Sequence, residues 1–344
     1  MVNPDHSWSE DCAIAFSKYP LWMRKTCFLS LFTPLLFILA AHGQAPPAKH
    51  QFSLQAQSPK FWNLFAHDAK LDTLATGFGF TEGALWDERG FVWVSDETLN
   101  KLFRVYSDGR KEEFLAIGDP DGNTYDKQHR LLDCASVLRA VIRFQDNRKD
   151  YDVIADRYQG MKFNSPNDVV LGPDGAIYFT DPTYDLPQGE KQEIPFQGVY
   201  RVGDRGEVQL LTKDLKQPNG LAFSPDGKHL YIDDSDNRNI HVFDFNPNRT
   251  ISNGRIFGEE PGAKDDGVPD GMKVDRAGNV YVTGPQGIWV WDAEGHHLGT
   301  IVLPEQPANL AWGDADYSTL YITATTSVYK LRTMTHGFVP YLSH

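Results

Sequence analysis

Basic residues are scarce in this 344-residue sequence: 33 Lys and Arg stand against 46 Asp and Glu, which gives a formal net charge of −13 at pH 7. Because binding to a nucleic-acid backbone depends on clustered Lys and Arg, we expect no nucleic-acid partner. Sustained helical periods and low-complexity tracts are also missing, which disfavours an α-helical domain and extensive disorder. The 41% of hydrophobic and 12% of aromatic residues are enough to fill a globular interior.

Near the N-terminus the apolar run Cys27–Ala41 is shorter than the roughly 20 residues of a membrane-spanning helix. It follows a basic start, Met23–Thr26, and precedes small residues, which is the layout of a secretory signal peptide. We interpret 1–43 as a signal peptide, with Met23 as an alternative start, and expect a periplasmic or secreted protein without stable membrane insertion after cleavage. An uncleaved N-terminal anchor is the alternative.

Cysteine is scarce as well, with three in the sequence. Cys12 and Cys27 lie in the proposed signal peptide, so Cys134 alone remains, and one cysteine cannot form an internal disulfide. We interpret Cys134 as a buried, unreactive thiol. Residues 44–66 are interpreted as a linker, 67–336 as the main domain and 337–344 as a C-terminal tail.

A short pattern occurs six times along the main domain. Each occurrence has a lead residue, usually with a carboxylate or carboxamide oxygen, followed by an apolar run, a turn and a second apolar run. The lead residues are Glu82, Asp121, Asn167, Asn219, Asp270 and, in a degenerate repeat, Ala308. Their spacings of 39, 46, 52, 51 and 38 residues are typical of one four-stranded β-propeller blade per repeat. We therefore predict an all-β fold, a six-bladed β-propeller.

The third repeat shows the strand pattern most clearly. Asp168–Leu171 and Ala176–Thr180 are β-rich runs joined by a Gly-Pro-Asp-Gly turn, which predicts a hairpin. Asp174 is accordingly interpreted as a turn former, as are Asp226 and Asp275 in the next two repeats. We expect the ring to close by pairing of a strand near 69–74 with a C-terminal strand around 327–331, because closure removes exposed sheet edges.

If the repeats are equivalent blades, their lead residues converge on one axis. Glu82, Asn167, Asn219 and Asp270 would bring two carboxylates and two amide carbonyls together, and such hard oxygen donors suit a divalent cation. Four protein donors leave part of the calcium coordination shell open to water and substrate, as in a catalytic site. We predict Ca²⁺, with Zn²⁺, Mg²⁺ or Mn²⁺ as alternatives. The simpler alternative is that these residues only cap strand ends.

Five stretches carry a resemblance to a known family: Gly77–Gly83, Asn164–Asp168, Tyr178–Pro182, Gln217–Leu221 and Pro269–Met272. In them the chain resembles the gluconolactonase, regucalcin and luciferin-regenerating-enzyme group of six-bladed propellers. The resemblance implies a lactone hydrolase with a divalent metal on the propeller axis. It implies Glu82, Asn219 and Asp270 as metal ligands, and Asn167 as a further ligand or a substrate contact. It also implies Asp270 as the group that transfers a proton.

The second blade departs from the family pattern. Bacterial members that resemble this chain carry Cys-Glu-His where it has Cys134-Ala135-Ser136, and Asp121-Gly122 stands where they have Asn-Gly. Both changes lie where the substrate should touch the pocket. In the related paraoxonase propellers the corresponding lead position holds the proposed base, so Asp121 is a second candidate base and a substrate contact. Its alternative interpretation is a turn former before Gly122.

The loop 181–187 is longer than a hairpin needs, and Tyr184 within it is a candidate substrate contact. Together these features predict an exported metal-dependent lactonase whose partner is a small sugar lactone. The metal would polarise the carbonyl, water would attack, and Asp270 or Asp121 would take the proton. A carboxylate bound to a dication is a poor base, which keeps Asp121 in consideration. The alternatives are a non-enzymatic propeller that binds a ligand or partner on its axial face and a strictosidine-synthase-like enzyme.

Overall fold

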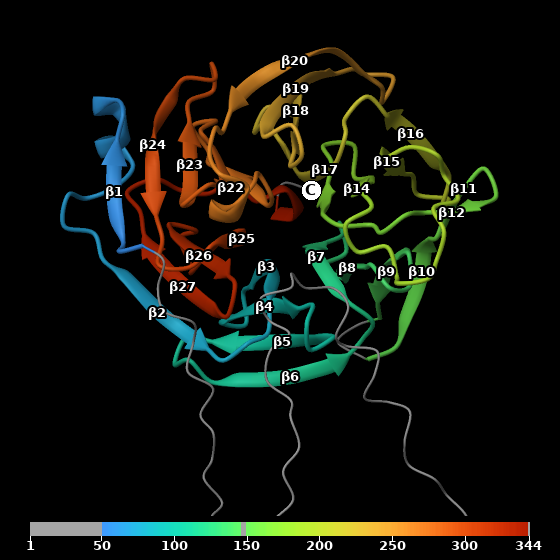
Figure 1. Ribbon diagram of the computed structural model, residues 1–344, viewed down its shortest axis with the longest axis horizontal. Coiled ribbons are helices and arrows are strands. Elements are labelled where there is room, and N and C mark those ends of the chain that lie inside the picture. Colours follow the sequence, from blue (N-terminus) through green and yellow to red (C-terminus); the bar gives the residue numbers. More distant parts are fainter. Residues whose placement is uncertain (1–49, 146–148, 343–344) are drawn as a thin grey trace, which may run out of the picture. The chain divides into compact units, whose positions relative to one another are not determined.

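Six antiparallel sheets surround a common axis in the structure, a computed structural model that describes residues 50–145 and 149–342 (Figure 1). The predicted all-β six-bladed propeller is confirmed, and the described residues contain no α-helix. Nowhere in these ranges does a helix offer the length and apolarity needed to cross a membrane. The proposed signal peptide, 1–43, lies outside the described residues.

The blades follow one another along the chain, each with its first strand nearest the axis. The first three blades contain β3 (Thr81–Asp87), β4 (Phe91–Asp96), β5 (Lys101–Tyr106), β6 (Lys111–Ala116); β7 (Pro120–Tyr125), β8 (Leu131–Ala135), β9 (Ala140–Phe144), β10 (Tyr151–Ala155); and β13 (Val169–Leu171), β14 (Ile177–Asp181), β15 (Gly198–Val202), β16 (Val208–Thr212). A small hairpin of β11 (Arg157–Tyr158) and β12 (Met161–Lys162) lies between the second and third blades in sequence.

The last three blades contain β17 (Pro218–Phe223), β18 (His229–Asp234), β19 (Asn239–Phe245), β20 (Ile251–Glu259); β21 (Met272–Val274), β22 (Val280–Gly284), β23 (Gly287–Trp291), β24 (His297–Val302); and β25 (Pro307–Gly313), β26 (Thr319–Ala324), β27 (Ser327–Arg332). Of two N-terminal strands, β1 (Ser53–Ala56) adds a fifth strand to blade 5, and β2 (Leu71–Thr76) completes blade 6 as its fourth strand. Three short 3₁₀ turns, η2 (Pro59–Asn63), η3 (Lys264–Asp266) and η4 (Pro340–Leu342), accompany the strands.

Ring closure has the predicted form. β2 pairs antiparallel with β27, from Leu71 opposite Leu331 to Thr76 opposite Ser327. The first and last blades also pack through aromatic rings: Trp86 on β3 stacks on Tyr321 of β26 with ring centroids 5.1 Å apart. Closure therefore joins residues near both ends of the domain through backbone pairing and a buried aromatic contact.

Close approach of neighbouring inner strands explains why glycine recurs directly after the lead residues. A Cβ atom on Gly220 would lie 1.9 Å from the carbonyl oxygen of Asp270 in the next blade. A Cβ on Gly122 would lie 2.7 Å from the carbonyl oxygen of Asn167, which accepts a hydrogen bond from the Gly122 N–H at 2.8 Å. Glycine thus lets neighbouring inner strands approach closely at this end of the axis, which brings the lead residues together.

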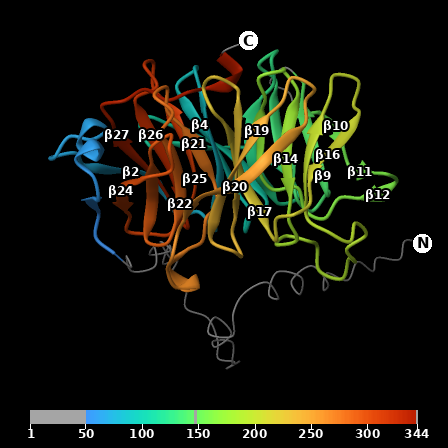
Figure 2. The same cartoon turned by 90° about the horizontal axis from the view of Figure 1, so that it is seen from above.

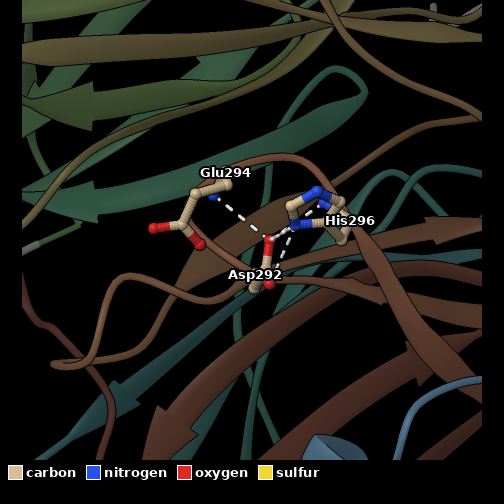
Figure 3. Close-up of side chains that lie close together, drawn as sticks. All are labelled: Asp292, Glu294 and His296. Carbon is tan, nitrogen blue, oxygen red and sulfur yellow. Dashed lines mark hydrogen bonds and ion pairs between the residues drawn. The ribbon is translucent and has the colours of Figure 1, made fainter.

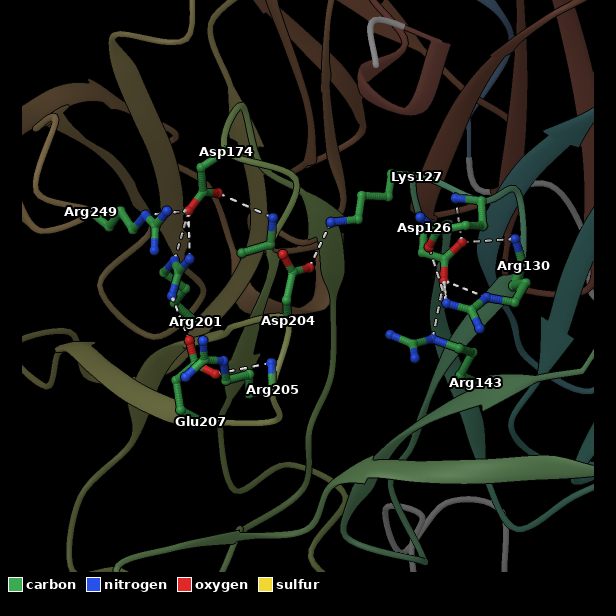
Figure 4. Close-up of polar contacts among 12 residues, drawn as sticks. Asp126, Lys127, Arg130, Arg143, Asp174, Arg201, Asp204, Arg205, Glu207 and Arg249 are labelled. Atoms are coloured by element: carbon green, nitrogen blue, oxygen red, sulfur yellow. Dashed lines mark hydrogen bonds and ion pairs between the residues drawn. The ribbon is translucent and has the colours of Figure 1, made fainter.

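At the opposite end of the ring, aspartates stabilise the turns that follow the first strands. Asp174 accepts hydrogen bonds from the Ala176 N–H and the Tyr178 hydroxyl and forms an ion pair with Arg201 (2.7 Å). Asp126 similarly pairs with Arg130 and Arg143 (Figure 4). Asp226 and Asp275 accept backbone N–H groups within their own turns. These contacts confirm the interpretation of the turn aspartates as structural.

The segments predicted as a linker and as a C-terminal tail both contain regular secondary structure. Part of the predicted linker 44–66 is strand β1, which pairs with β24 from Ser53 opposite Val302 to Ala56 opposite Gly299. The predicted tail 337–344 includes η4, which lies at one end of the ring (Figure 2). The Tyr341 hydroxyl there donates to the Trp86 carbonyl at 3.2 Å, above an axial cavity of about 50 Å³. η4 therefore covers the axis at the end away from the lead residues.

Candidate metal centre

The predicted lead residues meet at the end of the axis opposite η4. Glu82, Asp121, Asn167 and Asn219 are 1–6% exposed, and Asp270 is half-buried. Each stands at or just before the first strand of its blade, so the ring of blades points all five side chains toward one region. The structure thus brings together the residues that the repeat pattern singled out.

One carboxylate oxygen of Glu82 accepts hydrogen bonds, and the other accepts none. Its Oε2 accepts the Gly83 N–H at 2.6 Å and the Asn309 side-chain amide at 2.8 Å. Its Oε1 is buried and has no hydrogen-bond partner. Burial raises the pKa of Glu82 to about 7, although these two hydrogen bonds oppose the shift. A buried, unpartnered carboxylate oxygen is costly unless a cation or a proton binds it.

Asn219 and Asp270 form the second part of the centre. The Asn219 side chain hydrogen-bonds the Asp270 carboxylate, and its Oδ1 is buried without a hydrogen-bond partner. Desolvation, and then the negative charge of Glu82, raise the pKa of Asp270 well above its usual range. The two carboxylates therefore repel each other, which a cation between them would reverse.

Asp121 and Asn167 are joined directly across blades 2 and 3. The Asn167 Nδ2 donates to Asp121 Oδ2 at 2.7 Å, and the Ser136 hydroxyl lies 3.5 Å from the same oxygen. Burial raises the pKa of Asp121 well above its usual value, and neighbouring carboxylates add to the shift. Cys134, close by in sequence, is fully buried as predicted, and burial raises the pKa of its thiol.

Three further polar residues, Asp168, Lys273 and Asn309, were not predicted from the sequence to belong to the site. In blades 3 and 6 the residue after the lead position is Asp168 or Asn309 instead of glycine. Asn309 links Glu82 to Lys273, whose Nζ lies 3.2 Å from Asn309 Oδ1. Burial raises the pKa of Asp168, as it does that of Glu82, and the positive charge of Lys273 opposes both shifts. The absence of glycine after the lead position in these two repeats was the sequence signal that could have identified Asp168 and Asn309.

The rim of the site contains further groups. The Tyr184 hydroxyl donates to Asp236 at 3.2 Å, and the Tyr184 side chain is 42% exposed. Glu97, directly after β4, and Asp185, in the loop after β14, were not predicted as site residues. The charges of both residues raise the pKa of Asp121, and that of Asp185 also raises the pKa of Asp270. Neither lies in a repeated motif, so only the folded ring brings them to the axis.

Another group of metal-binding residue types lies in the turn between β23 and β24: Asp292, Glu294 and His296 (Figure 3). Asp292 Oδ1 accepts the backbone N–H groups of Glu294 and His296, and Oδ2 pairs with Lys60 at 3.0 Å. These contacts engage both carboxylate oxygens in turn capping and ion pairing. This turn therefore has none of the unpartnered buried oxygens found on the axis.

The chemistry of the axial donors fits a divalent cation. Glu82 Oε1 and Asn219 Oδ1 are buried acceptors without donors, and Asp270 supplies a second carboxylate beside them. Three hard oxygens with two negative charges suit calcium or a similar ion, and three protein ligands leave coordination positions for water and substrate.

Comparisons with known proteins bear on the fold and the family of the chain. Residues 80–326 match the SMP-30/Gluconolactonase/LRE-like region. The chain is 31% identical to a gluconolactonase of Zymomonas mobilis, covering 81% of this chain and 86% of the relative. It is 26% identical to a pentonolactonase of Haloferax volcanii, covering 70% and 80%. A solved gluconolactonase structure from Xanthomonas campestris has a TM-score of 0.76 at 30% identity, covering 85% and 98%.

Proposed function

The chain belongs to the SMP-30/gluconolactonase/LRE-like family, and we propose that it is a divalent-metal-dependent lactonase that hydrolyses a sugar lactone. The observation that carries the proposal is the pair of buried, unpartnered oxygens, Glu82 Oε1 and Asn219 Oδ1, beside Asp270. The similarity to gluconolactonases over most of the chain supports the substrate class. The incomplete set of protein ligands supports a catalytic use of the ion.

In this proposal Glu82, Asn219 and Asp270 hold the ion, and Asn167 completes its shell or contacts the substrate. We propose calcium, with zinc, magnesium or manganese as alternatives. When bound, the ion would supply Lewis acidity toward the lactone carbonyl oxygen. Tyr184, exposed at the rim, is the proposed contact for the rest of the substrate.

We assign the general base to Asp121. Its carboxylate is held by Asn167 but does not belong to the proposed ligand set, whereas a carboxylate bound to a dication is a poor base. Asp121 would take a proton from water as the water oxygen bonds to the carbonyl carbon. The ring C–O bond then breaks, the ring oxygen takes this proton from Asp121 and becomes a hydroxyl, and the new carboxylic acid ionises in solution.

A panel of sugar lactones, assayed with chelator and with metals added back one at a time, tests this function. We expect turnover that disappears with chelator and returns with one or more divalent metals. A metal-loaded protein that binds lactones without hydrolysing any of them would instead identify a binding propeller. Turnover that is unaffected by complete metal removal would refute the metal-dependent mechanism.

We further propose that the protein is exported, on the basis of the three-part layout of 1–43. N-terminal sequencing of exported material should find a start near Gln44. Recovery of soluble, full-length cytoplasmic protein that retains Cys27 would contradict export.

A further inference from the structure

A side chain outside the proposed ligand set holds Glu82 in place. Asn309, on β25 of the last blade, is 2% exposed, and its Nδ2 donates to Glu82 Oε2 at 2.8 Å. The same oxygen accepts the Gly83 N–H at 2.6 Å. A carboxylate oxygen offers about two lone-pair positions, so these two donors occupy both positions of Oε2. Oε1, which is buried without a partner, can therefore bind an ion without the loss of a hydrogen bond.

The orientation of the Asn309 amide follows from its other contacts. Its Oδ1 accepts the Leu310 backbone N–H at 2.9 Å and a hydrogen bond from the Lys273 ammonium group at 3.2 Å. Both partners are donors only, so the amide oxygen must face them and the amide nitrogen must face Glu82. Glu82 Oε2 therefore meets a donor.

Packing fixes the same amide from the side of blade 5. A Cβ atom on Gly271 would lie 2.3 Å from Asn309 Cγ, so the backbone directly after Asp270 packs against the amide. The hydroxyl of Thr323, on β26, accepts the Asn309 backbone N–H and donates to the Asn309 carbonyl oxygen, both at 3.1 Å. The amide is thus held between the Gly271 backbone and the carboxylate of Glu82.

Lys273 places a positive charge at the far end of this arrangement. Its ammonium group donates to the Met272 carbonyl oxygen at 2.9 Å as well as to Asn309, and its side chain lines the axial cavity. A cationic donor on Oδ1 polarises the amide and strengthens the hydrogen bond that Nδ2 donates. The line of contacts from Lys273 through Asn309 to Glu82 joins blades 5, 6 and 1 and ends on Oε2.

The number of oxygens that Glu82 offers affects the choice of ion. Calcium takes about 6–8 oxygen ligands and binds carboxylates through one or both oxygens, whereas magnesium demands near-ideal octahedral geometry. Manganese also suits an octahedral set of oxygen ligands. Glu82 held at Oε2 offers one oxygen, which suits all three ions. A released Oε2 would be an additional ligand that calcium can accept and that an octahedral ion accepts only with distortion.

We propose that Asn309 and Lys273 are positioning residues that restrict Glu82 to metal binding through Oε1 alone, and that they thereby limit the preference of the site for calcium over magnesium and manganese. This inference rests on the metal centre of the proposed function and not on the identity of the lactone. Neither residue takes part in the bond-breaking steps.

Metal titration of the whole protein without lactone tests this inference. The dissociation constants of Ca²⁺ and Mn²⁺ are measured by calorimetry for the wild-type protein, Asn309→Leu, Lys273→Met and the double variant. Asn309→Leu keeps the approximate size of the side chain and removes the donor to Oε2. Thr323→Val is the matched control, because it removes hydrogen bonds to the Asn309 backbone and leaves the amide contacts in place.

Loss of an outer contact to a metal ligand typically weakens metal binding about 10- to 100-fold. We expect Asn309→Leu to weaken Mn²⁺ binding by about this factor and Ca²⁺ binding by less, because the released Oε2 can bind calcium. The ratio of the Mn²⁺ to the Ca²⁺ dissociation constant should then rise by at least about fivefold. The charge of Lys273 acts alike on both dications, so its direct effect cancels in this ratio.

Lys273→Met should raise the ratio by less than Asn309→Leu does, and it should add nothing in the double variant, because Lys273 acts through Asn309. Thr323→Val should lower the Tm and leave the ratio unchanged. An unchanged ratio in either single variant would overturn the inference, as would additive effects in the double variant. A shift in Thr323→Val equal to that in Asn309→Leu would also overturn it, because loss of packing would then explain both.

A crystal structure of the calcium-loaded wild-type protein gives a check that does not depend on the folding of any variant. The inference predicts that Glu82 binds calcium through Oε1 alone, at about 2.3 to 2.6 Å, and binding through both oxygens would contradict it. A wild-type protein that binds neither ion would refute the metal centre and this inference together. A protein that binds metal but hydrolyses no lactone would refute the lactonase function and leave this inference standing.

Discussion

Replacing Glu82 with Gln should stabilise the metal-free protein and at the same time weaken its response to metal. The side chain is 3% exposed, and Oε2 accepts both of its hydrogen bonds while Oε1 accepts none. The glutamine oxygen can take the place of Oε2, and its amide nitrogen can take the place of the unpartnered Oε1. The substitution therefore removes a buried negative charge without removing a hydrogen bond.

The magnitude follows from the pKa of Glu82, which burial raises from 4.5 to about 7. Because the folded-state pKa is the higher one, the folded protein retains a proton that the unfolded chain releases between these values. The free energy of unfolding of metal-free protein therefore falls as pH rises from about 4.5 through about 7. At 1.36 kcal/mol per pKa unit the loss is about 3 kcal/mol.

Denaturant unfolding with chelator, at about pH 5 and about pH 8, measures this effect. We expect Glu82→Gln to exceed the wild-type protein in stability by up to about 3 kcal/mol at the higher pH and by much less at the lower. With calcium at about 100 times its Kd, the wild-type protein should gain about 2.7 kcal/mol and the variant little. Glu294→Gln, in an exposed turn, serves as the control. A metal-free variant less stable than the wild-type protein at about pH 8, or one with an undiminished calcium response, would refute this reasoning.

Three further changes test other parts of the structure. Asp121→Asn should lower lactone turnover by about 10²- to 10⁴-fold at saturating metal while metal titration stays near wild type; unchanged turnover would return Asp121 to a turn former. Gly220→Ala places a Cβ 1.9 Å from the Asp270 carbonyl oxygen, so we expect a lower Tm and weaker metal binding, and a variant that matches wild type in both would contradict the close-approach argument. Truncation after Thr323 removes β27, the partner of β2, and should abolish folding; a soluble truncated chain that melts cooperatively would count against closure by this pair.

The repeat pattern was enough to predict the ring, because a lead polar residue, a glycine and two apolar runs recur at blade-sized intervals. It also predicted the convergence of Glu82, Asn167, Asn219 and Asp270, since equivalent positions in a closed ring share an axis. Asn309 was not recognised, because its repeat was aligned on Ala308 and the hydrogen bond to Glu82 crosses from the last blade to the first. That contact depends on ring closure, which joins residues 227 positions apart.

Other features depend on tertiary packing that leaves no local pattern. Glu97 and Asp185 lie in loops of unrelated length, and only the folded ring brings both within electrostatic reach of Asp121. The covering of the axis by η4 depends on Tyr341, whose hydroxyl reaches the Trp86 carbonyl from the far end of the chain. Strand β1 comes from a Pro- and Gln-rich region that looks like a linker, and its pairing with β24 supplies the regularity that its own sequence does not show.

Anomalous diffraction from crystals of the protein grown with calcium or manganese tests the central claim most directly. The account predicts one ion on the propeller axis, about 2.3 to 2.6 Å from Glu82 Oε1, Asn219 Oδ1 and a carboxylate oxygen of Asp270 if calcium is bound. An axis without an ion at saturating metal, or an ion held only by Asp292, Glu294 and His296, would contradict it.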